Sequence, residues 1–211
     1  MPAQPDQRPL EANVNLVKFP KDAPQSYVLD QATPWIAALL AELNEDAGDQ
    51  GPERLAETAL TVRLELTRKW TNDTGEYMLA KGTIDGHYAA EDVKTLAPLM
   101  VPLVFPFKAV FLGEMALKLE EYLDADEAWL DSDTWQIYPY RKNVVDLGEM
   151  LHEQLFLHRL PYPSVDNLHQ AVQVEDTSPD FSSEDDGDLD DDGDDWDEDG
   201  SEFDTDDKSR Q

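Results

Sequence analysis

Residues 58–84 contain the pattern that most restricts the fold, an alternation of apolar and polar residues with a period of two. The apolar members of its first half are Leu60, Val62, Leu64 and Leu66. Successive side chains of a β-strand point to opposite faces, so this alternation predicts a strand with one buried face. The turn residues 72–75 separate it from a second run at 77–84. We therefore expect an antiparallel hairpin over 58–84.

The second run leads into a segment with two glycines and repeated prolines. Gly82 and Gly86 flank a β-branched pair, which favours a bulge or a close approach between backbones, and hence a bent sheet. The alternation continues over 99–111, where we expect another strand. Pro102 and Pro106 have no N–H to donate to a ladder. That strand is therefore expected at an edge of the sheet or with bulges.

Two helices are marked by their start signals. A helix over 34–43 is predicted because Thr33 can act as N-cap before a proline at the first helical position. A helix over 146–158 is predicted because Asp146 and Glu149 have the form of a capping box. The leucine–proline pair that follows the second helix should end it, since proline disfavours helix at the residue before it.

Length and composition limit the chain to one ordinary core. It has 211 residues, of which 40% are hydrophobic. We expect an α+β fold, with a single domain over 13–170 in which two short helices pack a bent antiparallel sheet, after a flexible N-terminus at 1–12. Residues 171–211 are rich in Asp and Glu and are expected to form a disordered acidic tail. The pattern over 114–133 fits both a strand and a short helix.

The charge of the chain is strongly negative and unevenly placed. The net charge is −31, and residues 175–211 hold 19 acidic and two basic side chains, which leaves 28 acidic and 14 basic ones on residues 1–174. Phosphate backbones are bound by Lys and Arg, so this composition argues against direct nucleic-acid binding and favours basic proteins as partners. The most apolar window, 97–107, is too short to span a bilayer, and no signal-type run begins the chain. A cytoplasmic protein without membrane association is the simplest interpretation.

Two blocks of the sequence resemble a known family. The positions of the first block are Gly82, Ile84, Gly86, Asp92, Lys94, Thr95, Leu96 and Pro98. The positions of the second block are Asp146, Leu147, Glu153, Leu155, Pro161 and Pro163. Their order and spacing resemble the YceD family, named for large ribosomal RNA subunit accumulation, whose signature runs Gly-x-Ile-x-Gly, five residues, then Cys-x-Arg-Cys-Leu-x-Pro. Asp92 and Thr95 stand at the two cysteine positions, so the chain resembles a divergent member without the cysteine pair.

The resemblance implies a non-catalytic role in ribosome biogenesis, in the processing or accumulation of large-subunit ribosomal RNA. Combined with the acidic charge, it predicts binding to basic ribosomal or RNA-associated proteins and, through them, an indirect association with large-subunit ribosomal RNA. Two alternatives stay open. The chain could be an acidic interaction module or nucleic-acid mimic unrelated to ribosomes, or a metal-dependent hydrolase that uses clusters of Asp or Glu.

Two motifs have the form of metal sites, but each departs from the required pattern. Residues 188–199 have the carboxylate spacing of a calcium loop, yet Asp199 stands where a longer bidentate Glu is needed and no helices are expected beside it. His152 and Glu153 begin a zincin motif, yet Phe156 occupies the place of the second histidine. We expect loose cation association at the first motif and helix-face packing at the second.

Two further segments each have two interpretations, a structural role and contact with a partner. Asp92, Lys94 and Thr95 are expected to form a structural turn with a local ion pair, with a partner-contact loop as the alternative. Residues 68–70, Arg-Lys-Trp, could stack on a nucleobase, but strand-end packing is expected in so acidic a chain. The sequence has no cysteine, phosphate loop, nucleophile elbow or cofactor fingerprint. We therefore expect no enzyme, and no catalytic, cofactor-binding or metal-binding residues.

Overall fold

The computed structural model describes residues 9–48 and 50–168. They form an α+β fold around a six-stranded sheet with the order β2-β3-β4-β5-β7-β6, as predicted for the class. Its strands are β2 (Gln25–Leu29), β3 (Ala59–Thr71), β4 (Gly75–Glu91), β5 (Pro98–Gly113), β6 (Glu127–Leu130) and β7 (Asp133–Tyr140). β1 (Asn13–Asn15) and β8 (Val144–Asp146) form a separate two-stranded sheet. The predicted tail at 171–211 and most of the predicted flexible N-terminus lie outside the described residues.

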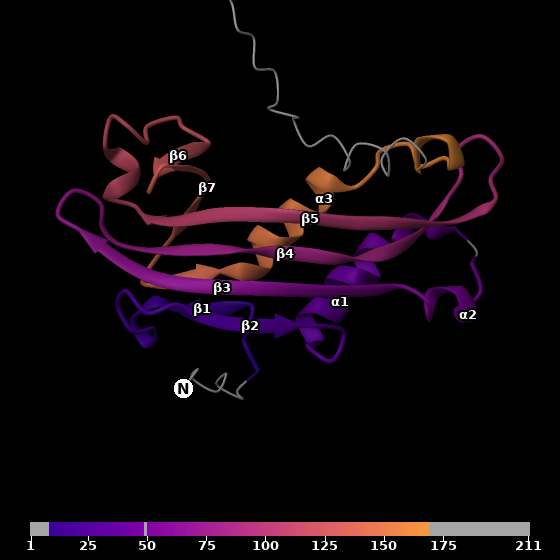
Figure 1. Cartoon of the computed structure of the whole chain (residues 1–211), viewed down its shortest axis with the longest axis horizontal. Helices are drawn as coiled ribbons and strands as arrows, with labels where there is room; N and C mark the ends of the chain where they lie inside the picture. The colour runs from indigo at the N-terminus through magenta and orange to yellow at the C-terminus, as the bar shows by residue number, and fades with distance from the viewer. Residues whose placement is uncertain (1–8, 49, 169–211) are drawn as a thin grey trace, which may run out of the picture. The chain divides into compact units, whose positions relative to one another are not determined.

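Two helices cover one face of the sheet, as expected. α1 (Pro34–Leu43) and α3 (Leu147–His158) both lie behind the long strands β3, β4 and β5 in Figure 1. Asp146 is the N-cap of α3, and its Oδ1 accepts a hydrogen bond of 2.9 Å from the N–H of Glu149. Thr33 is the N-cap of α1 but makes no side-chain bond there. α2 (Pro52–Leu55) and the 3-10 turns η1 (Leu16–Lys18), η2 (Glu45–Ala47) and η3 (Ala116–Lys118) are additional.

One pair of strands departs from the predicted antiparallel sheet. β7 lies parallel to β5, from Ala109 opposite Gln136 to Gly113 opposite Tyr140. A parallel pair needs a crossover connection, and residues 114–132 supply it. This segment contains both η3 and the strand β6, which explains why its sequence fits both a strand and a short helix.

The main core lies between the sheet and the two helices. Its largest fully buried side chains include Leu60 and Leu66 of β3, Ile36 of α1 and Met150 of α3. A second, smaller cluster contains Tyr77, Leu79, Val110, Leu112 and Trp135. Its residues on β4 and β5 alternate with those of the main core, so it lies on the opposite face of the same strands. Near residues 109–112 both faces of β5 are buried, which explains the loss of alternation there.

The glycines of the first signature block lie where β3 and β4 approach closely. Gly82 pairs with Leu64 and Gly86 with Leu60, and β4 continues through both to Glu91 instead of ending near residue 84. A Cβ atom at Gly82 would stand 2.0 Å from the carbonyl oxygen of Arg63, and one at Gly86 would meet β3 backbone at 2.3 Å. The prediction of a close backbone approach is thus confirmed at both positions.

The prolines of β5 lie on a stretch of strand that has one neighbour. Residues 98–108 pair with β4, and β7 joins β5 only from Ala109 onward. Pro98, Pro102 and Pro106 are all exposed. Because proline cannot donate to a further strand, this part of β5 is an edge. The prediction of an edge strand is confirmed.

Candidate functional site: the junction of the β4–β5 loop and the post-helix segment

The carboxylate of Asp92 organises the loop that joins β4 to β5, residues 92–97. Its Oδ1 accepts hydrogen bonds from the backbone N–H of Lys94 at 2.8 Å and of Thr95 at 3.0 Å. The backbone N–H of Leu96 donates to the carbonyl of Asp92 at 2.8 Å, and the N–H of Asp92 donates to the carbonyl of Ala97 at 2.9 Å. Asp92 is only 3% exposed. The side chain therefore closes a tight turn, which is the structural role that the sequence predicted.

The same carboxylate ties this loop to the segment that follows α3, residues 160–168. Oδ2 of Asp92 accepts a bond of 3.0 Å from the N–H of Val165, and the N–H of Val93 donates to the carbonyl of Pro163 at 3.0 Å. Lys94 Nζ lies 2.6 Å from Asp166 Oδ2. We call this arrangement the junction. It brings part of the first signature block into contact with the end of the second.

The Asp92 carboxylate accepts three backbone hydrogen bonds. The N–H groups of Val165, Thr95 and Lys94 hold the pKa of its carboxyl below the ordinary value. These bonds give the carboxylate a structural role in the loop. The local ion pair predicted here exists, but it joins Lys94 to Asp166 and not to Asp92.

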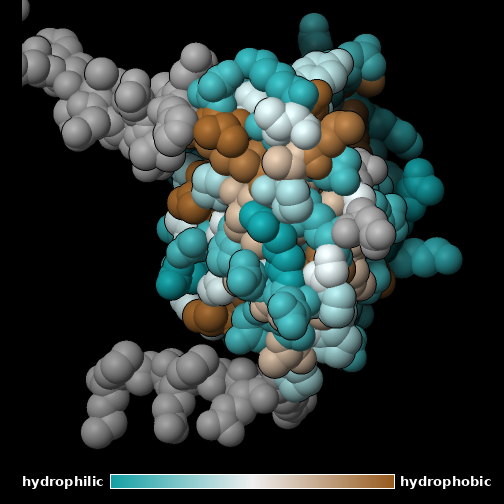
Figure 2. Space-filling model, turned by 90° about the vertical axis from the view of Figure 1, so that its right-hand side faces the viewer, coloured by the Kyte–Doolittle hydropathy of each residue, from teal (hydrophilic) through white to brown (hydrophobic). Residues whose placement is uncertain are grey.

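Leu96 occupies an unusual position in the junction. Its φ of 56° lies in the left-handed region, which a branched apolar residue rarely adopts. Its side chain is 72% exposed. Tyr162 is 71% exposed, and Val93 and Val165 are each 49% exposed. We call these four residues the apolar rim; Figure 2 views this end of the molecule and shows hydrophobic side chains gathered near the top of the face.

The remaining signature residues serve the fold elsewhere. Leu147 and Leu155 are fully buried in the main core, as is Ile84 of the first block. Glu153 is exposed on α3, where its Oε1 accepts a bond of 3.3 Å from Gln136. Pro161 is exposed. The two blocks thus converge only at the junction, and their other positions are spread over the sheet and α3.

The two histidines of α3 have separate partners. His152 Nε2 lies 3.6 Å from Glu42 Oε2, and its ring lies 4.5 Å from that of Phe156. His158 stacks on Phe105 with the ring centroids 3.7 Å apart. Among the described residues no three His, Asp or Glu side chains are grouped as metal ligands. These contacts favour the packing interpretation for the helix, while the calcium-like pattern at 188–199 lies outside the described residues.

Residues 68–70 pack at the end of β3. The Arg68 guanidinium donates to the carbonyl of Phe19 at 3.1 Å and pairs with Glu76. Lys69 Nζ lies 3.6 Å from a carboxylate of the β6–β7 turn. Trp70 is half-exposed, with the ammonium of Lys21 5.6 Å from its ring centroid. Both cations of the motif are therefore engaged within the protein, as strand-end packing requires.

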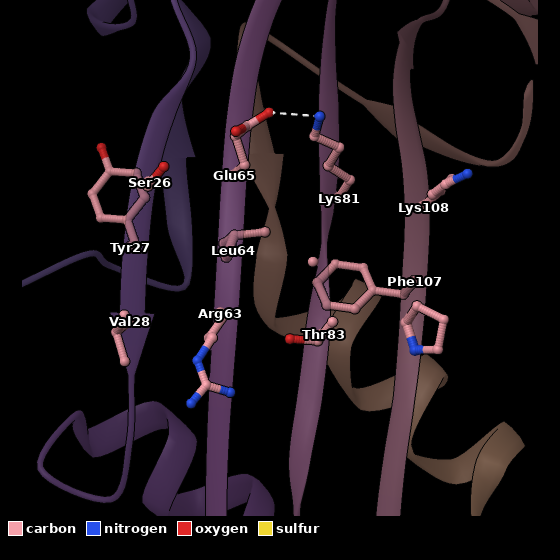
Figure 3. A pocket seen from close by; sticks show the side chains of 12 residues that line it. Ser26, Tyr27, Val28, Arg63, Leu64, Glu65, Lys81, Thr83, Phe107 and Lys108 are labelled. Atoms are coloured by element: carbon pink, nitrogen blue, oxygen red, sulfur yellow. Dashed lines mark ion pairs between the residues drawn. The ribbon is translucent and has the colours of Figure 1, made fainter. Parts of the chain in front are cut away.

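A shallow hollow of about 460 Å³ lies over β2 to β5, on the face opposite the helices (Figure 3). No local sequence pattern reveals this hollow, because only the strand register brings its lining residues together. Three of those residues are cations, each close to a carboxylate. The pairs are Arg63–Asp85, Lys81–Glu65 and Lys108–Asp133. With its charges neutralised in this way, the hollow has no evident site for an anionic ligand.

The residues of the apolar rim were also not all identified from sequence. Leu96 belongs to the signature, but Val93, Tyr162 and Val165 carry no local pattern that separates an exposed apolar residue from a buried one.

No helix in the described ranges has the length and apolarity needed to cross a bilayer. In comparisons with known proteins, no family model, curated protein or solved structure matches this chain. The resemblance to the YceD family depends on the two sequence blocks alone.

Proposed function

We propose that this protein is a non-catalytic ribosome biogenesis factor, which supports processing or accumulation of large-subunit ribosomal RNA by binding basic ribosomal or RNA-associated proteins. The ribosomal setting comes from the resemblance of the two sequence blocks. The class of partner, a basic protein, comes from the acidic charge of the chain. The pairing of its cations with its own carboxylates adds support for this class.

The observation that carries the partner class is the internal pairing of the basic side chains. Eight lysines and arginines lie within salt-bridge distance of carboxylates of the same chain. They are Lys21, Arg63, Arg68, Lys69, Lys81, Lys94, Lys108 and Arg141. Residues 1–174 hold 14 basic side chains in all, against 28 acidic ones. Because most of these cations already face a carboxylate and acidic residues outnumber basic ones two to one, a polyanion would meet an excess of carboxylates, whereas a cationic protein would meet a favourable field.

The test is salt-dependent binding of the full chain to the RNA-free proteins of the large ribosomal subunit. Attraction between exposed charges weakens as the Debye length falls from about 10 Å at 0.1 M salt to about 3 Å at 1 M. We expect steep loss of binding over this range. A full-length variant with the carboxylates of 175–211 changed to amides should bind less tightly and with a shallower salt dependence. An affinity that changes neither with salt concentration nor in this variant would contradict the proposal.

The concentration of charge in residues 175–211 favours one competing function, an acidic interaction module or nucleic-acid mimic unrelated to ribosomes. This segment holds 19 of the 47 acidic residues of the chain. Fusing it to an unrelated carrier separates the two proposals. A mimic keeps its partners on the carrier, whereas the biogenesis factor requires the folded residues as well.

A further inference from the structure

One side of β5 is the longest free strand edge among the described residues. β4 pairs with residues 98–108 on one side, and β7 joins the other side only from Ala109 onward (Figure 1). The outermost strands of the sheet, β2 and β6, have only five and four residues. A row of unpaired backbone N–H and C=O groups is a template for a further strand. Residues 98–108 are therefore the part of the sheet most open to strand addition.

The same stretch has the side chains of a segment that associates between chains. Residues 97–107 include no charged residue. On the face toward the helices its side chains are buried in the main core, and they are Leu99, Val101, Leu103, Phe105 and Phe107. On the other face Val104 is 59% exposed. Apolar segments of about six or seven residues with high β-propensity, low charge and no proline stack readily between chains. Only its prolines separate this segment from that class.

The prolines lie where they remove donors from the free edge. Residues along a strand turn their N–H and C=O groups alternately toward one neighbouring strand and the other. A proline fits a paired strand only where its nitrogen faces away from the neighbour. Pro98, Pro102 and Pro106 are spaced four residues apart, so all three face away from β4, together with Met100 and Val104. Only these last two have an N–H to offer at the outward positions of 98–106.

A second copy of the same edge is the strand whose fit can be worked out from the described residues, because an edge can pair with itself about a two-fold axis. With the axis at Leu103, Pro102 lies opposite Val104 of the second copy, and Met100 lies opposite Pro106 of the second copy. A facing pair of this kind normally exchanges two N–H···O bonds. Each pair here forms only one, because proline has no N–H. The carbonyl left without a donor is desolvated in the interface, which opposes association.

We infer that Pro102 and Pro106 prevent β5 from pairing with β5 of a second copy. They act by removing backbone donors and not by changing the apolar face, so the strand keeps the side chains that its core requires. Adding the two missing N–H groups completes the ladder and joins two copies through this edge. The inference concerns self-association and is independent of the proposed function.

The test compares two double variants of the full chain by sedimentation velocity over a range of protein concentrations. Pro102→Thr/Pro106→Thr restores both donors with a β-branched residue that suits a strand, and threonine is more polar than proline, so no apolar surface is added. Pro20→Thr/Pro52→Thr is the matched control, because both of these prolines are exposed and lie outside the strands. Circular dichroism and thermal unfolding check that each variant is folded.

We expect the mass of the Pro102→Thr/Pro106→Thr variant to rise with concentration to about twice that of the wild type, as a closed two-fold pair requires. The Pro20→Thr/Pro52→Thr control should sediment like the wild type. Adding Val104→Lys to the first variant should restore the wild-type mass, because an exposed lysine on an edge strand blocks strand pairing.

Amide hydrogen exchange of the unaltered protein gives a second readout that needs no variant. The N–H groups of Met100 and Val104 face away from β4 and should exchange much faster than those of Val101 and Leu103, which face it.

Three results overturn the inference. The first is a Pro102→Thr/Pro106→Thr variant whose mass matches that of the wild type at every concentration. The second is association that persists after Val104→Lys is added, or that also occurs in the control, because it then does not depend on this edge. The third is slow exchange at Met100 and Val104 in the wild type, which would mean that the edge is already paired.

Discussion

Replacing Gly82 by alanine should destabilise the fold by an amount that follows from the β3–β4 contact. The added Cβ would lie 2.0 Å from the Arg63 carbonyl oxygen and 2.9 Å from Cζ of Phe107, so β3 and β4 must separate by about 1 Å to reach even a tight contact of 3.0 Å. Overpacking of this kind costs about 3 kcal/mol, and alanine recovers up to about 1 kcal/mol by restricting the unfolded chain. We expect a net loss of about 2 kcal/mol.

Urea unfolding followed by circular dichroism measures this loss. With a slope of about 2 kcal/mol per molar urea, the midpoint should fall by about 1 M. Gly51→Ala is the matched control, because nothing lies within 4 Å of a Cβ there and its φ of −54° suits alanine. If the two variants unfold at the same urea concentration, the close approach does not explain the glycine.

Three other perturbations probe the junction, the core and the charges. Asp92→Asn turns an amide N–H toward a backbone donor, so we expect a lower thermal midpoint and faster hydrogen exchange at Val165 than in the wild type. The carboxyl pKa is lowered in the folded state, so this stabilisation is complete above the unfolded pKa of about 3.9 and disappears as the pH falls through the folded value. The thermal midpoint should therefore fall less on acidification in Asp92→Asn than in the wild type. An identical dependence of the midpoint on pH in the two proteins would contradict the role of the carboxylate. Met150→Ala empties a fully buried position of α3 and should cost about 2–5 kcal/mol in urea unfolding, whereas a loss below 1 kcal/mol would show that α3 is not part of the core. Lys81→Met removes an exposed charge pair with Glu65 and should change stability by less than about 1 kcal/mol, so a larger loss in the same assay would refute the view that these pairs only neutralise the surface.

Much of the fold could be predicted from the sequence because its signals are local. The alternation along β3 arises from burial of one strand face, and the capping pattern at Asp146 arises from bonds within one helical turn. The prolines of β5 likewise limit the partners of their own strand. Each of these patterns depends on neighbours within a few residues, so a single sequence contains the information.

The parts that were missed depend on distant contacts. The parallel pairing of β5 with β7 requires a crossover whose own sequence fits two structures. At the junction the bond between Asp92 and Val165 joins residues that are 73 positions apart. The signature placed Asp92 in a turn, but it could not show that the same carboxylate holds a second segment. Exposure of Tyr162 also depends on that tertiary contact, which no local pattern specifies.

The central claim is that the partner is a cationic protein and not a polyanion. It is tested most directly by measuring binding of the full chain to each of two ligands in parallel at physiological ionic strength. One ligand is the RNA-free protein of the large ribosomal subunit, and the other is naked large-subunit ribosomal RNA. The internal pairing of the cations predicts saturable binding to the proteins and none to the RNA at the same concentration. Tight binding to the RNA, with no binding to the proteins, would contradict the account.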